Sequence, residues 1–416
     1  MYLLGRNTLY VNNRNNQNKF NYRLNYFLVY FLFALGGVTT FSSNSRFVQG
    51  LFVFVILIFI YNNLAFDKKY YYIIIVVSII YFAQAITAKS MEINSIFYLF
   101  YVFFIPYGII KIVGLKFAEY YIKITYVFAL ISFLFLIPSY ISVDFRNSVK
   151  DFANWIDLDP LVGVHDNFII YNHELMNEGL IKNPGPFYEA GAFGTFLIIA
   201  LILNLIKTNK ILEKRNVIFI TTILSTFSTS SYLSLFSLVI FFFIQNKSIL
   251  IKSIITPFMI FIAFIIFSKL PFLQDKINSQ IEASQFQGEE RIGRIQGGLV
   301  DFKELLSNPI FGKGIASYKG SNNGLTGLAL SYGIIGFCLF FYLLVKSLKL
   351  YCKENNFNAN FGIYAAIPIA LVLSGQVLYS KPIFLALIMM FILYDNKVKK
   401  HYTRYAPKSI NYWRNI

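Results

Sequence analysis

Three charged residues are the best candidates for chemistry, and two of them are arginines. Arg291 and Arg294 open the segment 292–306, where apolar residues recur every three or four positions, so we predict an amphipathic helix there. Arginines three positions apart share one face of a helix, and two guanidinium groups together can bind a diphosphate. Alternatively, they pair with Glu289 and Glu290 or simply solvate the helix.

The third residue is Glu189, a carboxylate at the predicted start of an apolar segment. It follows the turn residues Gly185 and Pro186, and we expect it in the first turn of a helix, where the helix dipole favours a negative charge. There it could orient an arginine or a sugar hydroxyl, or it could be a plain N-terminal acid. Gly191 and Gly194 leave room for another helix to pack closely.

Metal or cofactor chemistry is not predicted. Asp157 and Asp159 form a D-x-D pattern, but three letters in an acidic loop carry little information, and no other acidic cluster has the spacing of metal ligands. His165 and His173 in the same loop show no ligand spacing, although either could accept a proton. With only two cysteines, the chain has no thiolate metal site and no disulfide framework.

The elements that must position these residues are strongly apolar. Of 416 residues, 56% are hydrophobic and 14% are charged, and the mean hydropathy is +0.57. These values exclude an ordinary cytosolic enzyme and a disordered protein. About eleven blocks approach the ~20 apolar residues that cross a bilayer. They cover 24–41, 47–66, 70–87, 93–110, 124–143, 187–206, 217–244, 253–270, 324–345, 361–379 and 382–394. We therefore predict an all-α polytopic membrane protein.

The net charge of +17 is distributed as in a membrane protein rather than a nucleic-acid-binding protein. If the N-terminus is cytoplasmic, the inside segments hold about two thirds of the lysines and arginines but only about a quarter of the acidic residues. This positive-inside pattern predicts that both termini face the cytoplasm and that basic residues contact anionic lipids. We expect no nucleic-acid partner and no cleaved signal peptide.

The block 217–244 breaks the alternation of sides, because basic residues flank it at both ends. It is too short for two full spans, and the small polar run Ser228–Ser231 lies near its middle. We predict two short helices that meet within the membrane or at its outer face, where the hydroxyl groups satisfy backbone groups. One long tilted span is the alternative. Counting the pair as two helices gives about twelve transmembrane segments.

Two large loops lie on the predicted outer face, and long loops on membrane proteins usually carry function. The predicted parts of the chain are a cytoplasmic N-terminal tail (1–23), N-terminal transmembrane helices (24–143), a first periplasmic loop (144–186), central transmembrane helices (187–270), a second periplasmic loop (271–323), C-terminal transmembrane helices (324–394) and a basic cytoplasmic tail (395–416).

Three stretches resemble the bacterial O-antigen and capsule repeat-unit polymerases (Wzy), within the wider family that includes the O-antigen ligases. Residues 183–194, NPGPFYEAGAFG, are similar to the family's G-x-F-x-E-P-G element, with Ala190 where proline is usual. Arg294 and the turn 308–314, NPIFGKG, are similar to the arginine-bearing helix and N-P-x-x-G-x-G turn of the second large periplasmic loop.

The third stretch, Asn323 followed by GIIG at 333–336, is similar to the family's signature where that loop returns to the membrane. In ligases the signature begins with an essential histidine, but here that position is Asn322. The difference favours a polymerase over a ligase and leaves the proton acceptor unassigned. The likeness covers roughly residues 180–345, and elsewhere only hydropathy agrees.

The resemblance implies a C-type glycosyltransferase at the periplasmic face of the inner membrane, which joins undecaprenyl-diphosphate-linked repeat units and releases undecaprenyl diphosphate. Arg294 and Arg291 would stabilise the departing diphosphate without a metal or cofactor, and Glu189 would orient a partner. Substrate contacts are expected from Lys182, Tyr188, Lys313 and Asn323. The expected partners are lipid-linked glycans and membrane lipids, with a chain-length regulator as a further candidate.

Three other functions are alternatives. A ligase would use the same donor but transfer the glycan to lipid A-core. A flippase or other transporter usually carries buried charges or internal repeats, and the sequence shows no convincing repeat. A non-catalytic membrane scaffold would not need the arginines.

Overall fold

The computed structural model of the chain describes residues 22–38, 41, 45–88, 93–156, 166–167, 169–175, 181–245, 294–314 and 323–395. The predicted span 253–270 and much of the predicted second loop lie outside the described residues.

The N-terminal part consists of long apolar helices. They are a helix over 22–37, α3 (Ser45–Tyr61), α4 (Lys68–Ala88), α5 (Ile93–Val113) and α6 (Phe117–Ile141). The chain turns between α5 and α6 at Gly114, whose φ of 68° opens the short 3-10 helix η1 (Gly114–Lys116). α6 therefore begins at Phe117 rather than at the predicted residue 124, because its first turns are buried in the core instead of forming a loop.

The predicted first loop, 144–186, contains a helix and a small sheet. These are α7 (Val143–Ile156), β1 (Asp166–Asn167), β2 (Asn172–Leu175) and β3 (Ile181–Lys182). The strands pair antiparallel in the order β1-β2-β3. Val149 and Ala153 of α7 pack against Tyr171, which stacks on Phe135 of α6. The sheet is a small addition to the predicted all-α fold, and it ties the loop to the helices.

The central part contains α8 (Ala190–Thr208), α9 (Lys214–Ser225) and α10 (Thr229–Ile244). Between α9 and α10 the backbone leaves helical geometry at Phe227, with a φ of 47°, and at Ser228, with an extended ψ of 117°. The predicted break within 217–244 is confirmed, and the alternative of one continuous helix is wrong.

The C-terminal part contains α13 (Arg294–Leu305), α14 (Gly324–Glu354), α15 (Phe361–Tyr364), α16 (Ala366–Ser374) and α17 (Pro382–Met389), which continues over 391–395. α13 agrees with the amphipathic helix predicted over 292–306. α14 has a break at Gly333 that the sequence did not predict. α16 ends at Ser374 rather than at the predicted residue 379, so a turn of seven residues, 375–381, separates it from α17.

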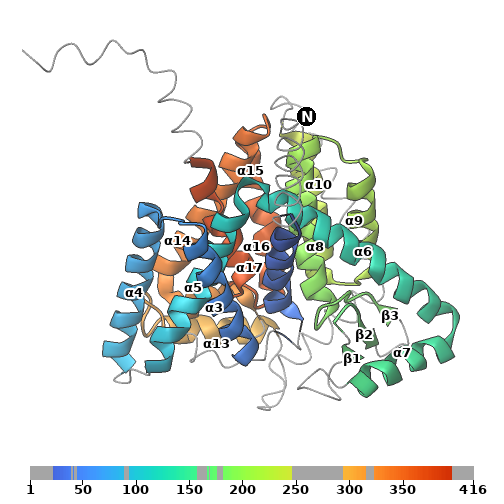
Figure 1. Ribbon diagram of the computed structural model, residues 1–416. Coiled ribbons are helices and arrows are strands. Elements are labelled where there is room, and N and C mark those ends of the chain that lie inside the picture. Colours follow the sequence, from blue (N-terminus) through green and yellow to red (C-terminus); the bar gives the residue numbers. More distant parts are fainter. Residues whose placement is uncertain are drawn as a thin grey trace, which may run out of the picture.

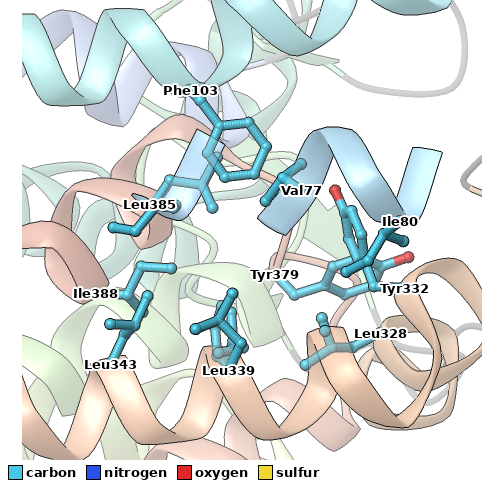
Figure 2. A pocket seen from close by; sticks show the side chains of 13 residues that line it. Val77, Ile80, Phe103, Leu328, Tyr332, Leu339, Leu343, Tyr379, Leu385 and Ile388 are labelled. Carbon is cyan, nitrogen blue, oxygen red and sulfur yellow. The ribbon is translucent and has the colours of Figure 1, made fainter. Parts of the chain in front are cut away.

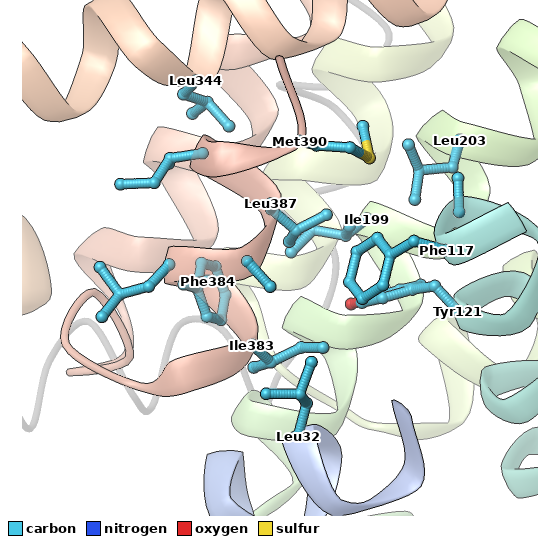
Figure 3. Close-up of a cluster of buried hydrophobic side chains, with 14 of the residues drawn as sticks. Leu32, Phe117, Tyr121, Ile199, Leu203, Leu344, Ile383, Phe384, Leu387 and Met390 are labelled. Carbon is cyan, nitrogen blue, oxygen red and sulfur yellow. The ribbon is translucent and has the colours of Figure 1, made fainter. Parts of the chain in front are cut away.

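The core is centred on α8 and α17. Every residue of α8 from Ala190 to Ile206 is buried, as is every residue of α17 from Ile383 to Met389. Figure 3 shows Phe117 and Tyr121 of α6 close to Ile199 of α8. A helix that is apolar on all sides must be surrounded by other helices or by lipid, and α8 is surrounded by helices.

The outer helices expose apolar side chains instead. On α4, Ile75, Ile79 and Phe82 are more than half exposed, as expected for a surface in contact with lipid. Four segments are long and apolar enough to cross a membrane: Lys68–Thr87, Tyr101–Ile141, Ala190–Thr208 and Gly324–Glu354. The second of these joins most of α5 to α6 through η1. Four shorter apolar helices are Arg46–Tyr61, Thr229–Ile244, Phe361–Ser374 and Pro382–Asp395. The described residues thus form a helical, membrane-embedded protein, and the count of twelve segments stays a prediction.

The described parts of the two predicted outer loops lie at the same end of the bundle. In Figure 1, α7, the three strands and α13 are at the lower end, which we call the loop end, and α15 is at the opposite end. α8 and α14 begin at the loop end, since each follows one of these loops directly.

Candidate functional site

The end of the first loop is held in place by Asn183, which is fully buried. Its Nδ2 donates to the Oγ atoms of Ser132 in α6 and Ser225 in α9, both at 2.9 Å. Its Oδ1 accepts a 3.2 Å hydrogen bond from the N–H of Gly185, which closes the turn. Asn183 therefore joins the loop to the broken helix pair, which explains why an asparagine begins this stretch.

Glu189 lies one residue before α8, at its N-cap, and not within its first turn as predicted. Its carboxylate makes no capping hydrogen bond to the helix; instead, Oε1 accepts a hydrogen bond from Nε2 of Gln376. The Oε1 of Gln376 in turn accepts from the hydroxyl of Tyr188 at 3.0 Å. Gln376 thus bridges two predicted site residues. We call Tyr188, Glu189 and Gln376 the Gln376 cluster.

Several helix ends meet around this cluster because glycines line the contacts. A side chain at Gly191 of α8 would overlap the side chain of Gln376, and one at Gly324 of α14 would overlap its carbonyl group. A side chain at Gly375 would overlap Ser230 of α10. The first turns of α8, α10 and α14 therefore approach the end of α16 closely, in agreement with the close contact predicted at Gly191.

The turn 308–314 packs into the break of α14. Gly333 has a φ of 67°, a conformation that glycine adopts without steric cost. Next to it, the N–H of Ile334 donates to the carbonyl of Pro309 at 2.9 Å instead of to a carbonyl one turn earlier in the helix. A side chain at Gly333 would overlap the backbone of the turn, so this position needs glycine for two reasons.

The turn and α4 satisfy the carbonyl groups that the break leaves free. The N–H of Lys313 donates to the carbonyl of Leu330 at 2.7 Å. Gln84, buried on α4, donates through Nε2 to the carbonyl of Ser331 at 2.8 Å and to that of Phe311 at 2.5 Å. The NPIFGKG and GIIG motifs, which are separate in the sequence, are therefore two halves of one structural unit.

Arg294 begins α13, which packs across the first turn of α14. A side chain at Gly298, one turn after Arg294, would come within 3.5 Å of Thr326. Asp301 is buried, and its Oδ2 accepts a 2.6 Å hydrogen bond from Oγ1 of Thr326. These contacts fix α13 at the loop end and place Arg294 there.

The first turn of α14 connects α13 to the Gln376 cluster. Asn323 caps α14, since its Oδ1 accepts from the N–H groups of Leu325 at 3.1 Å and Thr326 at 3.3 Å. The next residue, Gly324, lies against the carbonyl of Gln376. The capping bonds give Asn323 a structural role, and its contact with substrate stays a prediction.

The other predicted site residues are less tightly grouped. Lys313 forms an ion pair with Glu304, with 3.6 Å between Nζ and Oε2, and both side chains are about one third exposed. Lys182 is half-buried in β3, opposite Glu174 of β2. Arg291, Asp157, Asp159 and His165 lie outside the described residues, so the predictions made for them stay predictions.

Sequence reasoning missed Gln376 and Lys381, the two polar residues with functional potential in the turn 375–381. Hydropathy placed Gln376 inside a span and left Lys381 in a short gap between two spans. A usable signal was present: Gly375 and Pro382 bracket a polar stretch between two short apolar blocks, which is typical of a turn.

An apolar groove lies between α4, α5, α14 and α17, and about 450 Å³ of space lies within and above it, including the part that is open to solvent. In Figure 2, Tyr332 and Tyr379 lie together at one end of the groove, and Leu343 and Ile388 lie at the other. The hydroxyl of Tyr379 shares a 2.7 Å hydrogen bond with Ser331, close to the break of α14. The groove therefore offers an apolar surface, and its more polar end lies near the turn 308–314.

No protein-family model, curated protein or solved structure matches the chain. Within the part of the chain that the structure describes, no group of three or more His, Cys, Asp and Glu side chains could hold a metal ion. The described site combines a carboxylate held by an amide, a helix that begins at an arginine and an adjoining apolar groove.

Proposed function

We propose that the chain is a C-type glycosyltransferase that polymerises undecaprenyl-diphosphate-linked oligosaccharide repeat units and releases undecaprenyl diphosphate. One observation carries the proposal. At the loop end, a continuous set of contacts links the helix that begins at Arg294, the first turn of α14, Gln376 and Glu189. These contacts support a common site that includes Glu189 and the start of α13.

The proposed reaction breaks one glycosidic bond to a diphosphate and forms one new glycosidic bond. The bond between the anomeric carbon of the growing glycan and its diphosphate breaks, and a hydroxyl of the incoming unit attacks the anomeric carbon. Because the leaving group is already good, the main requirement is to stabilise the negative charge on the departing diphosphate. Arg294 would supply that stabilisation, and Glu189, held by Gln376, would orient the acceptor hydroxyl or an arginine.

The apolar groove supports a lipid-linked substrate rather than a soluble one. Its lining is hydrocarbon from four helices, and the exposed face of α4 lies next to it. A prenyl chain would leave the lipid phase for a surface of similar polarity, so the groove would position the chain at little cost. The diphosphate would then lie near the turn 308–314.

The proposal places the loop end in the periplasm and both termini in the cytoplasm, at the inner membrane. Acidic residues at the opposite end are paired: Asp67 with Lys111 at 2.8 Å, and Glu119 with Lys123 at 2.7 Å. The remaining lysines and arginines give that end its positive charge, which favours the cytoplasmic side.

The orientation is tested with a reporter that is active only in the cytoplasm. Fusions at Asn216, before the broken pair, and at Lys247, after it, should both be active because the pair returns to the side from which it came. A periplasmic result at Lys247 would show that an odd number of crossings separates the two positions, and the proposed topology would be wrong.

The function is tested by expressing the gene in a strain that lacks its own repeat-unit polymerase. We expect a ladder of glycan chains on gels of lipopolysaccharide or capsule, where the parent strain shows only single capped units. Because those single units already require a flippase and a ligase, restored polymer excludes both of these alternatives. Absence of a ladder, with the protein present in the membrane and matched repeat units supplied, would contradict the proposal.

A further inference from the structure

Lys381 is the last residue of the turn 375–381, between α16 and α17. Its side chain is only partly accessible to solvent, and burial lowers the pKa of its ammonium group below the ordinary value for lysine. Among the described residues, the ammonium group has no ion-pair or hydrogen-bond partner. Lys381 is therefore a half-buried lysine whose ammonium group has no matching anion in the described structure.

Three other half-buried lysines, near the opposite end of the bundle, have such a partner. Lys69 pairs with Asp395, Lys111 with Asp67, and Lys123 with Glu119. Their charges are neutralised by the protein itself. A buried charge that is not neutralised destabilises the fold, and an anionic ligand would remove this cost at Lys381.

Lys381 shares its turn with residues of the candidate site. Its N–H donates to the carbonyl of Leu378 at 3.0 Å, which closes the turn that also carries Gln376. Between them, Tyr379 lines the apolar groove and bonds to Ser331 beside the break of α14. The turn that carries Lys381 therefore also carries Gln376 of the polar cluster and Tyr379, which lines the polar end of the groove.

We propose that Lys381 binds a phosphate oxygen of the lipid-linked substrate, as an anion-binding residue in addition to the arginine-bearing helix. This inference deepens the proposed function, because the anion would be the diphosphate whose hydrocarbon chain occupies the groove. Lysine suits the position as a point charge that can follow the diphosphate as it separates from the glycan.

The experiment measures binding of undecaprenyl diphosphate to the full chain in nanodiscs of phosphatidylcholine, by native mass spectrometry or by competition. Lys381→Met keeps the length of the side chain but removes the charge, and Lys381→Arg keeps the charge. Lys346→Met, on α14 away from the loop end, is the matched control. Undecaprenol, which lacks phosphate, and inorganic diphosphate are the two comparison ligands.

We expect Lys381→Met to weaken binding of undecaprenyl diphosphate about tenfold or more, as expected for the loss of one hydrogen bond to a charged group. Lys381→Arg and Lys346→Met should bind nearly as the original chain does, and undecaprenol should bind all variants equally. Weaker binding of inorganic diphosphate alone would assign the site to a free phosphate compound and overturn the lipid assignment.

Unchanged binding of undecaprenyl diphosphate to Lys381→Met would overturn the inference. Lys381→Gln provides a second substitution if the methionine variant does not give a monodisperse protein. This outcome can be distinguished from failure of the proposed function. If the original chain restores no polymer ladder but Lys381→Met weakens binding of undecaprenyl diphosphate, the anion site is supported and the polymerase is not. If the chain restores a ladder but Lys381→Met binds undecaprenyl diphosphate normally, the polymerase is supported and the anion site is not.

Discussion

The hydrogen bond between Glu189 and Gln376 allows a structural carboxylate to be distinguished from a functional one. In the double variant Glu189→Gln with Gln376→Glu, the two groups are exchanged across the same contact. The amide of residue 189 can donate to the new carboxylate, which can still accept from Tyr188. The hydrogen bonds are thus kept, while the negative charge moves from the start of α8 to the end of α16.

The single variants show how much stability each side of this contact contributes. Gln376→Leu leaves the half-buried carboxylate of Glu189 without this donor, and losing a hydrogen bond to a charged group costs about 2 kcal/mol, or roughly 30-fold in an equilibrium. Glu189→Gln keeps a neutral amide pair and should cost about 1 kcal/mol. Glu354→Gln, an exposed carboxylate at the opposite end, is the control and should change neither stability nor polymer.

The assay combines thermal unfolding of the purified protein with the polymer ladder in cells. We expect the exchanged pair to restore the melting temperature relative to Gln376→Leu, but to leave the ladder impaired, since the charge is no longer at position 189. A full ladder from the exchanged pair would refute the functional role of Glu189 and reduce the contact to a helix-packing feature.

Three further changes test the break of α14, the role of Arg294 and the absence of a metal requirement. Gly333→Ala should destabilise the protein by about 1–3 kcal/mol, because alanine is strained at a φ of 67°. The control Gly50→Ala, within α3 where a side chain would meet no other atoms, should leave the melting temperature unchanged or raise it. Equal melting temperatures for the two variants would show that the break of α14 is not needed. Arg294→Ala should slow polymerisation roughly 100–1000-fold and leave single repeat units. Arg294→Lys should recover little activity, since a point charge cannot form the bidentate contact. A normal ladder from Arg294→Ala would contradict the mechanism. Asp157→Asn combined with Asp159→Asn should still polymerise in a chelator; activity lost there and regained with magnesium would show a metal requirement.

The sequence predicted those features that depend on local composition. Apolar blocks gave the helices, and the serine-rich run at 228–231 correctly indicated the break between α9 and α10, because several small hydroxyl residues interrupt an otherwise apolar block. The amphipathic period gave α13 to within two residues at its start. The motif around Asn183 and Glu189 was placed correctly at the join of loop and helix.

Features that depend on distant contacts were not predictable in this way. Gly333 stands within an apolar run, and only the turn 308–314, which lies far away in the sequence, explains why the helix breaks there. In the sequence, Gln376 is a single polar residue within a hydrophobic block. Its hydrogen bond to Glu189 becomes evident only from the packing of α8 against the end of α16. The short strands have too few residues to show an alternating pattern.

Polymerase activity can be measured with the purified chain and a lipid-linked repeat unit from its own host. After incubation in nanodiscs, mass spectrometry should show products of two or more repeat units on one lipid carrier, with one undecaprenyl diphosphate released for each bond formed. The same preparation of Arg294→Ala should leave the single units unchanged. Release of undecaprenyl diphosphate only when lipid A-core is supplied, with no chain longer than one unit, would contradict the polymerase and identify a ligase.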